Sequence, residues 1–319
     1  MSRAPHAWAR AFAPASSSNL GSGFDLLGHA IDGPRDEVTA RRRESPGVRI
    51  TALRGLPLPL PEDAARNTAG RAAMALLERA GAGFGVDLEL HKGIPLGSGI
   101  GGSAASAVAA VVAVNALLDT PQPMAVLLDC ALDGEAVASG ARHGDNVAPS
   151  LLGGLVAAFD RPVAITAPDW LHAALVTPDQ VLETRVAREV LKAPYALADV
   201  VSQTHHLAAL LLGLQRGDRA LLRDGLRDAL VEPRRAGLIP GFVAVRDAAL
   251  DAGALGAGIS GAGPTLFGWF DGRAAAERGA KAMQDAFAAQ GIAATALATP
   301  VAGPAAAVIA RDDDGEADR

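Results

Sequence analysis

The stretch His91–Ser106 reads HKGIPLGSGIGGSAAS and joins a predicted strand, Val86–His91, to a helix of small residues over about Ser103–Leu118. The first N–H groups of a helix have no carbonyl partners within it, and together with the helix dipole they attract anions. Glycines allow the loop between them to wrap closely around an oxyanion. The stretch therefore predicts a phosphate-binding loop and indicates a nucleotide ligand.

Two common nucleotide loops fit this stretch poorly. A Walker loop needs a Lys-Ser or Lys-Thr pair after its second glycine, and none is present. The dinucleotide fingerprint GxGxxG matches at Gly97, Gly99 and Gly102, but it matches again at Gly256–Gly261 in a chain with 36 glycines. A dinucleotide-binding unit also needs a strand after the helix, whereas DTPQP and a second helical stretch follow here. The fingerprint therefore fails in its structural context.

A third pattern fits better. Residues 95–105, PLGSGIGGSAA, resemble the phosphate loop of the GHMP small-molecule kinases, usually P-x-x-x-G-L-G-S-S-A-A. One departure is Gly102, which stands where the first serine of the Ser-Ser pair is usual and leaves Ser103 as the side-chain candidate for a phosphate or magnesium contact. Residues 13–28, APASSSNLGSGFDLLG, resemble the first motif of the homoserine kinases, and residues 256–265, GAGISGAGPT, resemble the third GHMP motif. Three motifs in the family's order identify the chain as a member of this group.

Composition narrows the classes of protein. The chain has 319 residues and 50% hydrophobic content, enough for two packed domains. A net charge of −6 without a basic stripe argues against a nucleic-acid partner. The apolar run Ala104–Leu118 is too short to span a membrane, and a signal-peptide pattern is absent. The single cysteine, Cys130, suits a reducing cytoplasm. We expect a cytoplasmic protein that acts on small molecules, and a homodimer stays open.

Strands and helices mix without strict alternation, which favours an α+β fold. The resemblance implies the two-domain GHMP kinase fold, with an N-terminal phosphate-loop domain over residues 1–160 and a C-terminal ferredoxin-like α+β domain over residues 161–310. The charged tail, residues 311–319, is predicted to be disordered. Residues 140–149 are expected to form a loop and residues 151–159 a strand. ATP would bind between the domains.

The resemblance further implies that the protein uses ATP and Mg²⁺ to phosphorylate the side-chain hydroxyl of L-homoserine. Phosphoryl transfer depends on positioning, a metal ion and neutralisation of charge. Glu135, upstream of the segment HGDNVAP at 143–149, resembles the family's metal-binding glutamate, and Ser103 is the second magnesium candidate. Lys92 is a candidate catalytic cation beside the phosphates, with a solvated lysine as the alternative.

The nucleotide contacts implied by the resemblance come from all parts of the loop and from two outlying segments. Asn67 matches the position that reads the adenine edge, although alone it would be only a helix N-cap. Ser260 and its glycines would bring a second backbone loop against the first, or else form a tight turn. The full set of ATP and phosphate candidates is Asn67, Pro95, Leu96, Gly97, Ser98, Gly99, Ile100, Gly101, Gly102, Ser103, Ala104, Ser260 and Gly261.

A small amino acid with a hydroxyl needs a separate set of groups. Arginine forks bind carboxylates best, and motif register favours Arg188 and Arg235 over their neighbouring arginines. Asp25 is the candidate partner for the ammonium group. Asp145 is a candidate catalytic base, with an orienting role and direct attack without a base as alternatives. The substrate candidates are Asn19, Asp25, His143, Asn146, Arg188 and Arg235.

Two other functions share parts of this pattern. A GHMP kinase for mevalonate or a sugar would share the phosphate loop, but it would leave the paired arginines and the segment NLGSGFD unexplained. A non-catalytic nucleotide-binding regulator on the same fold is the second alternative, and the departure at Gly102 is the feature that favours it.

Overall fold

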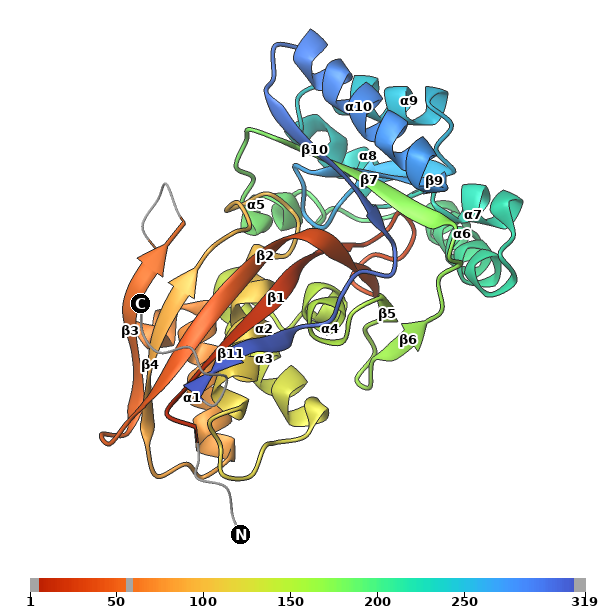
Figure 1. The fold of residues 1–319 in the computed structure, drawn as a ribbon. Coiled ribbons are helices and arrows are strands. Elements are labelled where there is room, and N and C mark those ends of the chain that lie inside the picture. The colour runs from red at the N-terminus through yellow and green to blue at the C-terminus, as the bar shows by residue number, and fades with distance from the viewer. Residues whose placement is uncertain (1–5, 56–59, 313–319) are drawn as a thin grey trace.

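The computed structural model describes residues 6–55 and 60–312, and within them the chain forms two sheets (Figure 1). The first has seven strands in the order β11-β1-β2-β4-β3, with β5 paired to β2 and β6 to β5. Its neighbours are antiparallel except β3 and β4, which run parallel. The strands are β1 (Trp8–Ser18), β2 (Leu27–Arg43), β3 (Gly47–Arg54), β4 (Gly85–His91), β5 (Leu155–Ala157), β6 (Val163–Ile165) and β11 (Ala307–Arg311).

Helix α2 lies at the centre of the first domain. It packs on β1 and β2 and touches the three other helices of this domain. Nearly all its side chains from Ala104 to Val114 are buried, and they are mostly alanine and valine, so the neighbouring helices can approach closely. The helix therefore holds the end of the glycine-rich loop in a rigid core. The helices are α1 (Thr68–Arg79), α2 (Gly102–Asn115), α3 (Met124–Ser139) and α4 (Gly144–Leu152), with a short 3₁₀ turn η1 (Ala64–Arg66) before α1.

The second sheet has four antiparallel strands in the order β10-β7-β9-β8. Along the chain, helices separate β7 from β8, and α10 separates β9 from β10. This order of strands and helices is that of a ferredoxin-like fold, as the sequence predicts. Helices α9 and α10 cover one face of this sheet (Figure 1). The elements are β7 (Leu171–Pro178), α5 (Thr184–Glu189), α6 (Leu197–Arg216), α7 (Arg219–Gly225), α8 (Glu232–Arg235), η2 (Ala236–Leu238), α9 (Phe242–Asp251), β8 (Gly256–Ile259), β9 (Leu266–Asp271), α10 (Arg273–Ala289) and β10 (Ala294–Pro300).

One hydrophobic core is shared by both domains, and another lies within the second domain, between its sheet and helices α9 and α10. Side chains of the second sheet, among them Leu171, Phe267 and Trp269, belong to the same buried cluster as the helices and strands of the first domain. The rings of His29 on β2 and Trp269 on β9 lie 6.2 Å apart across this junction. The halves therefore pack as one body. Among the described residues, the model contains no helix with the length and apolar character that crossing a membrane requires.

Sheet pairing assigns some segments differently from the sequence. Strands β6 and β11 belong to the first sheet, although the sequence analysis placed both segments in the C-terminal domain. Arg311 ends β11, and the carboxylate of Asp312 accepts a hydrogen bond of 2.6 Å from the N–H of Ala7, so these two residues are ordered where a tail was expected. Residues 313–319, the rest of that predicted tail, lie outside the described residues. The boundary at residue 160 stays a prediction.

The expected loop at 140–149 is wrong in its second half. Helix α4 covers Gly144–Leu152, and only Leu155–Ala157 of the expected strand is a strand. Pro149 suggests a turn, but it lies inside the helix, where it leaves the carbonyl of Asp145 without its usual partner. A side chain at Gly28 would approach that carbonyl to 1.9 Å, so a glycine is needed there.

Candidate active site

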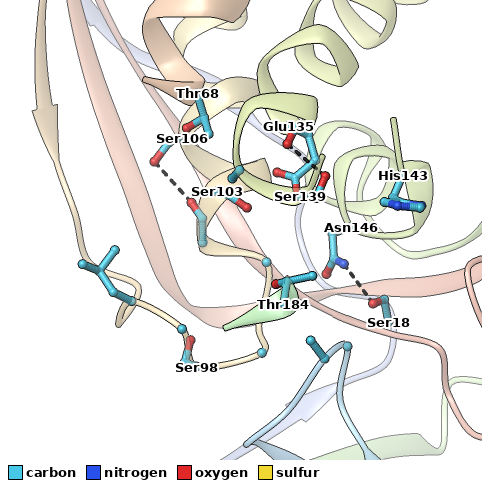
Figure 2. A pocket seen from close by; sticks show the side chains of 18 of the residues that line it. Ser18, Thr68, Ser98, Ser103, Ser106, Glu135, Ser139, His143, Asn146 and Thr184 are labelled. Atoms are coloured by element: carbon cyan, nitrogen blue, oxygen red, sulfur yellow. Dashed lines mark hydrogen bonds between the residues drawn. The ribbon is translucent and has the colours of Figure 1, made fainter. Parts of the chain in front are cut away.

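A cavity of about 430 Å³ lies at the junction of the domains, and segments far apart in the sequence form its wall. The first motif contributes Ser18, Asn19 and Asp25, the glycine-rich loop contributes residues 95–99 and 101–103, and the third motif contributes residues 261–263. Figure 2 shows that polar side chains from several elements point into it. Three of the predicted nucleotide contacts, Ile100, Ala104 and Ser260, are buried and do not line this cavity.

The glycine-rich loop depends on backbone conformations that favour glycine. Gly97, Gly99 and Gly101 have φ values of 62°, 82° and 69°. A Cβ atom at Gly99 would lie 2.5 Å from the carbonyl oxygen of Gly263. Gly101 is the N-cap of α2 and supplies no side-chain hydrogen bond to the helix. The start of α2 thus has no side-chain cap and lies against the cavity, as an anion site requires.

The third motif supports this loop from behind. The hydroxyl of Ser260 donates to the carbonyl of Gly99 at 3.0 Å, and the hydroxyl of Thr265 donates to the carbonyl of Ser98 at 2.6 Å. The N–H of Gly261 donates to the carbonyl of Ser18 at 3.0 Å, which links the third motif to the first. The structure therefore brings a second backbone loop against the first, and Ser260 acts through its contact with Gly99.

Lys92 differs from both sequence interpretations. Its side chain is buried, it forms an ion pair with Asp36, and it donates to the carbonyl of Gly102 at 2.7 Å and to the hydroxyl of Ser106 at 2.8 Å. A lysine ammonium has three hydrogens to donate, and these contacts use all of them. Lys92 is therefore neither solvated nor left with a free donor for a phosphate.

Glu135 lies on α3 beside Ser103 at the start of α2 (Figure 2). Burial raises the pKa of Glu135 to about 7, although a hydrogen bond from Ser103 opposes this effect. Its Oε2 atom has no hydrogen-bond partner among the described residues. A carboxylate oxygen without a partner beside a hydroxyl suits Mg²⁺, which prefers oxygen ligands. The described residues contain no group of three acidic, histidine or cysteine side chains that could hold a metal. Mg²⁺ in sites of this kind commonly takes phosphate and water oxygens beside one or two protein ligands.

The first turn of α4 carries the polar residues that the sequence placed in a loop. The side chain of Asn146 donates a hydrogen bond of 2.9 Å to the hydroxyl of Ser18 (Figure 2). It also accepts one of 2.9 Å from the hydroxyl of Ser16. Burial raises the pKa of Asp145, and the charge of Asp25 raises it further. Nδ1 of His143 lies 3.7 Å from a carboxylate oxygen of Asp25. His143, Asp145 and Asn146 therefore line the cavity together with the glycine-rich loop and with Asp25 and Arg188.

The predicted substrate charges meet at one end of the cavity. Arg188 donates two hydrogen bonds, of 3.1 and 2.7 Å, to the two carboxylate oxygens of Asp25. Arg235 is almost fully buried and donates to the carbonyls of Ala187 at 2.9 Å and Gly261 at 3.0 Å. Burial lowers the pKa of Arg235 to about 10, and the neighbouring Arg188 lowers it further. The two arginines therefore lie together, and one is already paired with the acid.

Two predicted asparagines have structural partners. Asn19, at a φ of 71°, donates to the carbonyl of Gly261 at 2.7 Å and accepts from the N–H of Asp25 at 3.0 Å, so it fixes the position of that acid. Asn67 caps α1, because its side-chain oxygen accepts from the N–H groups of Ala69 and Gly70. Asn67 also lines the cavity, and its adenine contact stays a prediction.

The comparisons with known proteins agree with this geometry. Residues 67–154 match the GHMP kinases N terminal domain, and residues 210–289 match the GHMP kinases C terminal domain. The homoserine kinase of Xanthomonas campestris is 55% identical over 303 residues, covering 95% of this chain and 94% of the relative. That of Xylella fastidiosa strain M12 is 54% identical over 302 residues, covering 94% of each. The chain belongs to the homoserine kinase family.

Solved structures support the same assignment. The homoserine kinase of Cytophaga hutchinsonii has a TM-score of 0.92 and 40% identity, covering 95% of this chain and 98% of that one. The mevalonate kinase of L. major has a TM-score of 0.69 at 17% identity, with coverage of 96% and 100%, and shares the fold alone. Membership of a kinase family implies the use of ATP. The two-domain GHMP kinase fold expected from the sequence is thereby confirmed.

Sequence reasoning missed several residues of this homoserine kinase site. Ser16 and Ser18 hold Asn146, and Asp36 and Ser106 hold Lys92. One signal was present for Asp36, because it lies in phase with the buried Val38 and Ala40 on the same strand. An acid in the buried phase of a strand requires a partner. Ser16 and Ser18 give no comparable signal, since their contacts come from a segment about 130 residues away.

Proposed function

We propose that this protein transfers the γ-phosphoryl group of ATP to the side-chain hydroxyl of L-homoserine, which gives O-phospho-L-homoserine on the route to threonine. The observation that carries the proposal is the pairing of two unlike regions in one cavity. The uncapped start of α2 and the carboxylate of Glu135 suit a metal-bound triphosphate. Asp25, Arg188 and Arg235 suit a zwitterion.

On the nucleotide side, the N–H groups at the start of α2 bind phosphate oxygens, and the third motif keeps the loop in place. Glu135 and Ser103 would be the protein ligands of Mg²⁺, which neutralises charge on the β- and γ-phosphate oxygens when bound. Closure of the two domains around one cavity keeps the acceptor hydroxyl near the γ-phosphorus and limits the access of water.

On the substrate side, the amino acid replaces contacts that the protein makes with itself. Its carboxylate takes the place of Asp25 on Arg188, with Arg235 beside it, and its ammonium group takes the place of Arg188 on Asp25. Asp145 is the carboxylate available to accept the hydroxyl proton as the new O–P bond forms, since its raised pKa favours proton uptake. Direct attack without a protein base is the alternative route for that proton.

A coupled assay of ADP release with a panel of alcohols tests this function. We expect kcat/KM for L-homoserine to exceed that for homoserinol, which lacks the carboxylate, by about 30-fold or more, because one buried charge then stays unpaired. Equal values for both would contradict the arginine clamp. A better rate with mevalonate or a sugar would assign another GHMP activity. Binding of ATP without turnover of any alcohol would favour the non-catalytic regulator.

A homodimer and a cytoplasmic location stay predictions. One structural feature favours a protein contact, because helix α6 exposes the apolar side chains of Leu197, Val201 and Leu212.

A further inference from the structure

Asp36 lies outside all three motifs, yet its carboxylate is among the most fully bonded groups near the cavity. It is 1% exposed at the inner phase of β2. Its Oδ1 atom accepts hydrogen bonds of 3.1 Å from the backbone N–H groups of Gly93 and Ile94. Its Oδ2 atom accepts from the ammonium group of Lys92 and, at 2.7 Å, from the hydroxyl of Ser106. Four donors thus converge on one carboxylate.

These contacts join three separate elements. Asp36 belongs to β2, Lys92 directly follows β4, and Ser106 lies on α2. Lys92 completes the cluster, because it also donates to the hydroxyl of Ser106 at 2.8 Å and to the carbonyl of Gly102 at 2.7 Å. All three side chains are at least 96% buried, and the two charges compensate each other. The cluster is therefore rigid and electrically balanced.

The cluster forms hydrogen bonds with both ends of the glycine-rich loop. The N–H groups of Gly93 and Ile94 lie where the chain leaves β4, and Gly102 is the first residue of α2. Between these two points the loop contains Gly97, Gly99 and Gly101, which have little conformational preference of their own. A loop of this kind needs its ends fixed from outside if its N–H groups are to converge on a phosphate.

We propose that Asp36 is a positioning residue for ATP, which acts through Lys92, Ser106 and the backbone N–H groups of Gly93 and Ile94. Asp36 does not line the cavity, whereas Lys92 and Ser106 do. Its effect therefore reaches the nucleotide only through the groups that it holds. The hydrogen bonds of Asp36 and Lys92 reach the two ends of the glycine-rich loop and not the charged side chains of Asp25 and Arg188, so we expect ATP binding to depend on Asp36 and homoserine binding not to. This inference rests on the proposed function.

The substitution Asp36→Asn tests the proposal, because asparagine keeps the shape and loses the charge that holds Lys92. We expect KM for ATP to rise by about 10-fold or more, with KM for homoserine within about 2-fold of wild type. Calorimetric titration with Mg·ADP should show the same loss without any need for turnover. The matched control is Glu37→Gln, the next residue on β2, whose carboxylate forms a surface pair with Arg35 and should leave every constant unchanged.

A purely structural role would give a different result. It would lower the melting temperature and the yield of folded protein, but the folded fraction would keep the wild-type KM for ATP. Unchanged ATP constants in folded Asp36→Asn would thus overturn the proposal.

If Asp36→Asn does not fold, Ser106→Ala decides the question, since it keeps the ion pair and removes one anchor. We expect its KM for ATP to rise by about 3- to 5-fold, and a wild-type value would refute the inference. The proposed function fails separately, when the wild-type protein binds Mg·ADP but does not phosphorylate homoserine.

Discussion

The two ends of the cavity differ in the state of their binding groups before a ligand is present. At the nucleotide end, backbone groups dominate, the start of α2 has no side-chain cap, and the nearby side chains of Lys92 and Ser106 are fully engaged behind the loop. At the substrate end, side-chain charges dominate, and they are already engaged with one another, as the double hydrogen bond between Arg188 and Asp25 shows.

Because of this difference, we expect the two ligands to lose different amounts of binding free energy to rearrangement of the protein. A preformed anion site binds phosphates without rearrangement, so little affinity is lost to reorganisation. In the proposed binding mode homoserine breaks the ion pair between Arg188 and Asp25, and its net affinity is the difference between the new contacts and the old ones. Only a ligand with both charges replaces both partners, whereas a ligand with one charge leaves Asp25 or Arg188 unpaired. In this proposal, the ion pair between Arg188 and Asp25 favours a zwitterionic ligand.

The largest expected effect comes from Glu135, where the nucleotide end depends on a side chain rather than on the backbone. Glu135→Gln keeps the shape and removes the negative charge that would hold Mg²⁺. We expect kcat to fall by about 10²- to 10³-fold, because the metal stabilises charge in the transition state. The measurement is steady-state kinetics over a wide range of Mg²⁺ concentration.

A surface acid provides the control for this experiment. Glu277→Gln on α10 removes an exposed carboxylate that pairs with Arg273, and it should leave kcat unchanged. A Glu135→Gln enzyme with wild-type kcat at saturating Mg²⁺ would remove Glu135 from the site and would leave the nucleotide end a purely backbone site.

The substrate end can be tested with Arg188→Met. Loss of the guanidinium leaves the carboxylate of the substrate with one arginine fewer, and we expect KM for homoserine to rise by about 50-fold with KM for ATP within about 3-fold of wild type. The expected rise in KM corresponds to the low end of the usual loss of binding free energy when one partner of a charged pair is removed, because the side chain of Arg188 is 29% exposed.

Arg185→Met on the same helix is the matched control, since that arginine is 81% exposed. Its constants should match those of wild type. A rise in KM for ATP equal to the rise for homoserine would show that Arg188 supports the whole cavity, and the two ends would then not be independent.

The same contrast explains how much the sequence could predict. The phosphate loop is a local feature, in which a strand end, a glycine-rich loop and a helix start are consecutive in the chain, so residues 91–106 predict it directly. Arg188 and Asp25 follow from family motifs, but their mutual pairing does not, since a ligand and an internal partner need the same groups. The sequence therefore predicts that Asp25, Arg188 and Arg235 belong to one site, and the structure places them in one cavity, whereas the pairing of Arg188 with Asp25 in the absence of a ligand was not predicted.

Other features depend on contacts that no local pattern encodes. Pro149 has no N–H to donate inside α4, and β2 passes so close to the freed carbonyl of Asp145 that only a glycine fits at position 28. Strand β11 returns to β1 after the whole second domain, and Ala9 there pairs with Arg311. Lys92 has the sequence position of a phosphate-binding lysine, but it forms an ion pair with the buried Asp36. In each case a distant residue decides the outcome.

The smallest expected effect concerns the junction that holds both ends together. His29 is fully buried beside Trp269, and its Nδ1–H donates to its neighbour's carbonyl at 2.9 Å. Its Nε2 atom has no partner within the part of the chain that the structure describes, so a proton there would lack an acceptor. Burial accordingly lowers the pKa of His29 from 6.5 to about 4. The folded protein thus excludes a proton that the unfolded chain accepts.

The sign of the pH effect follows from this difference. Between pH 6.5 and 4 the unfolded state binds the proton and the folded state does not, so the contribution is complete above pH 6.5 and is lost as the pH falls. From pH 7 to pH 5 His29 alone should reduce the free energy of unfolding by about 2 kcal/mol. Urea unfolding of wild type and His29→Gln, followed by tryptophan fluorescence, measures it, with the exposed His205→Gln as control. The raised pKa of Glu135 has the opposite sign, and because both proteins share it, the difference between their pH slopes isolates His29. Equal pH slopes for wild type and His29→Gln would show that His29 accepts protons in the folded state. The buried junction between the two domains would then not be sealed from solvent.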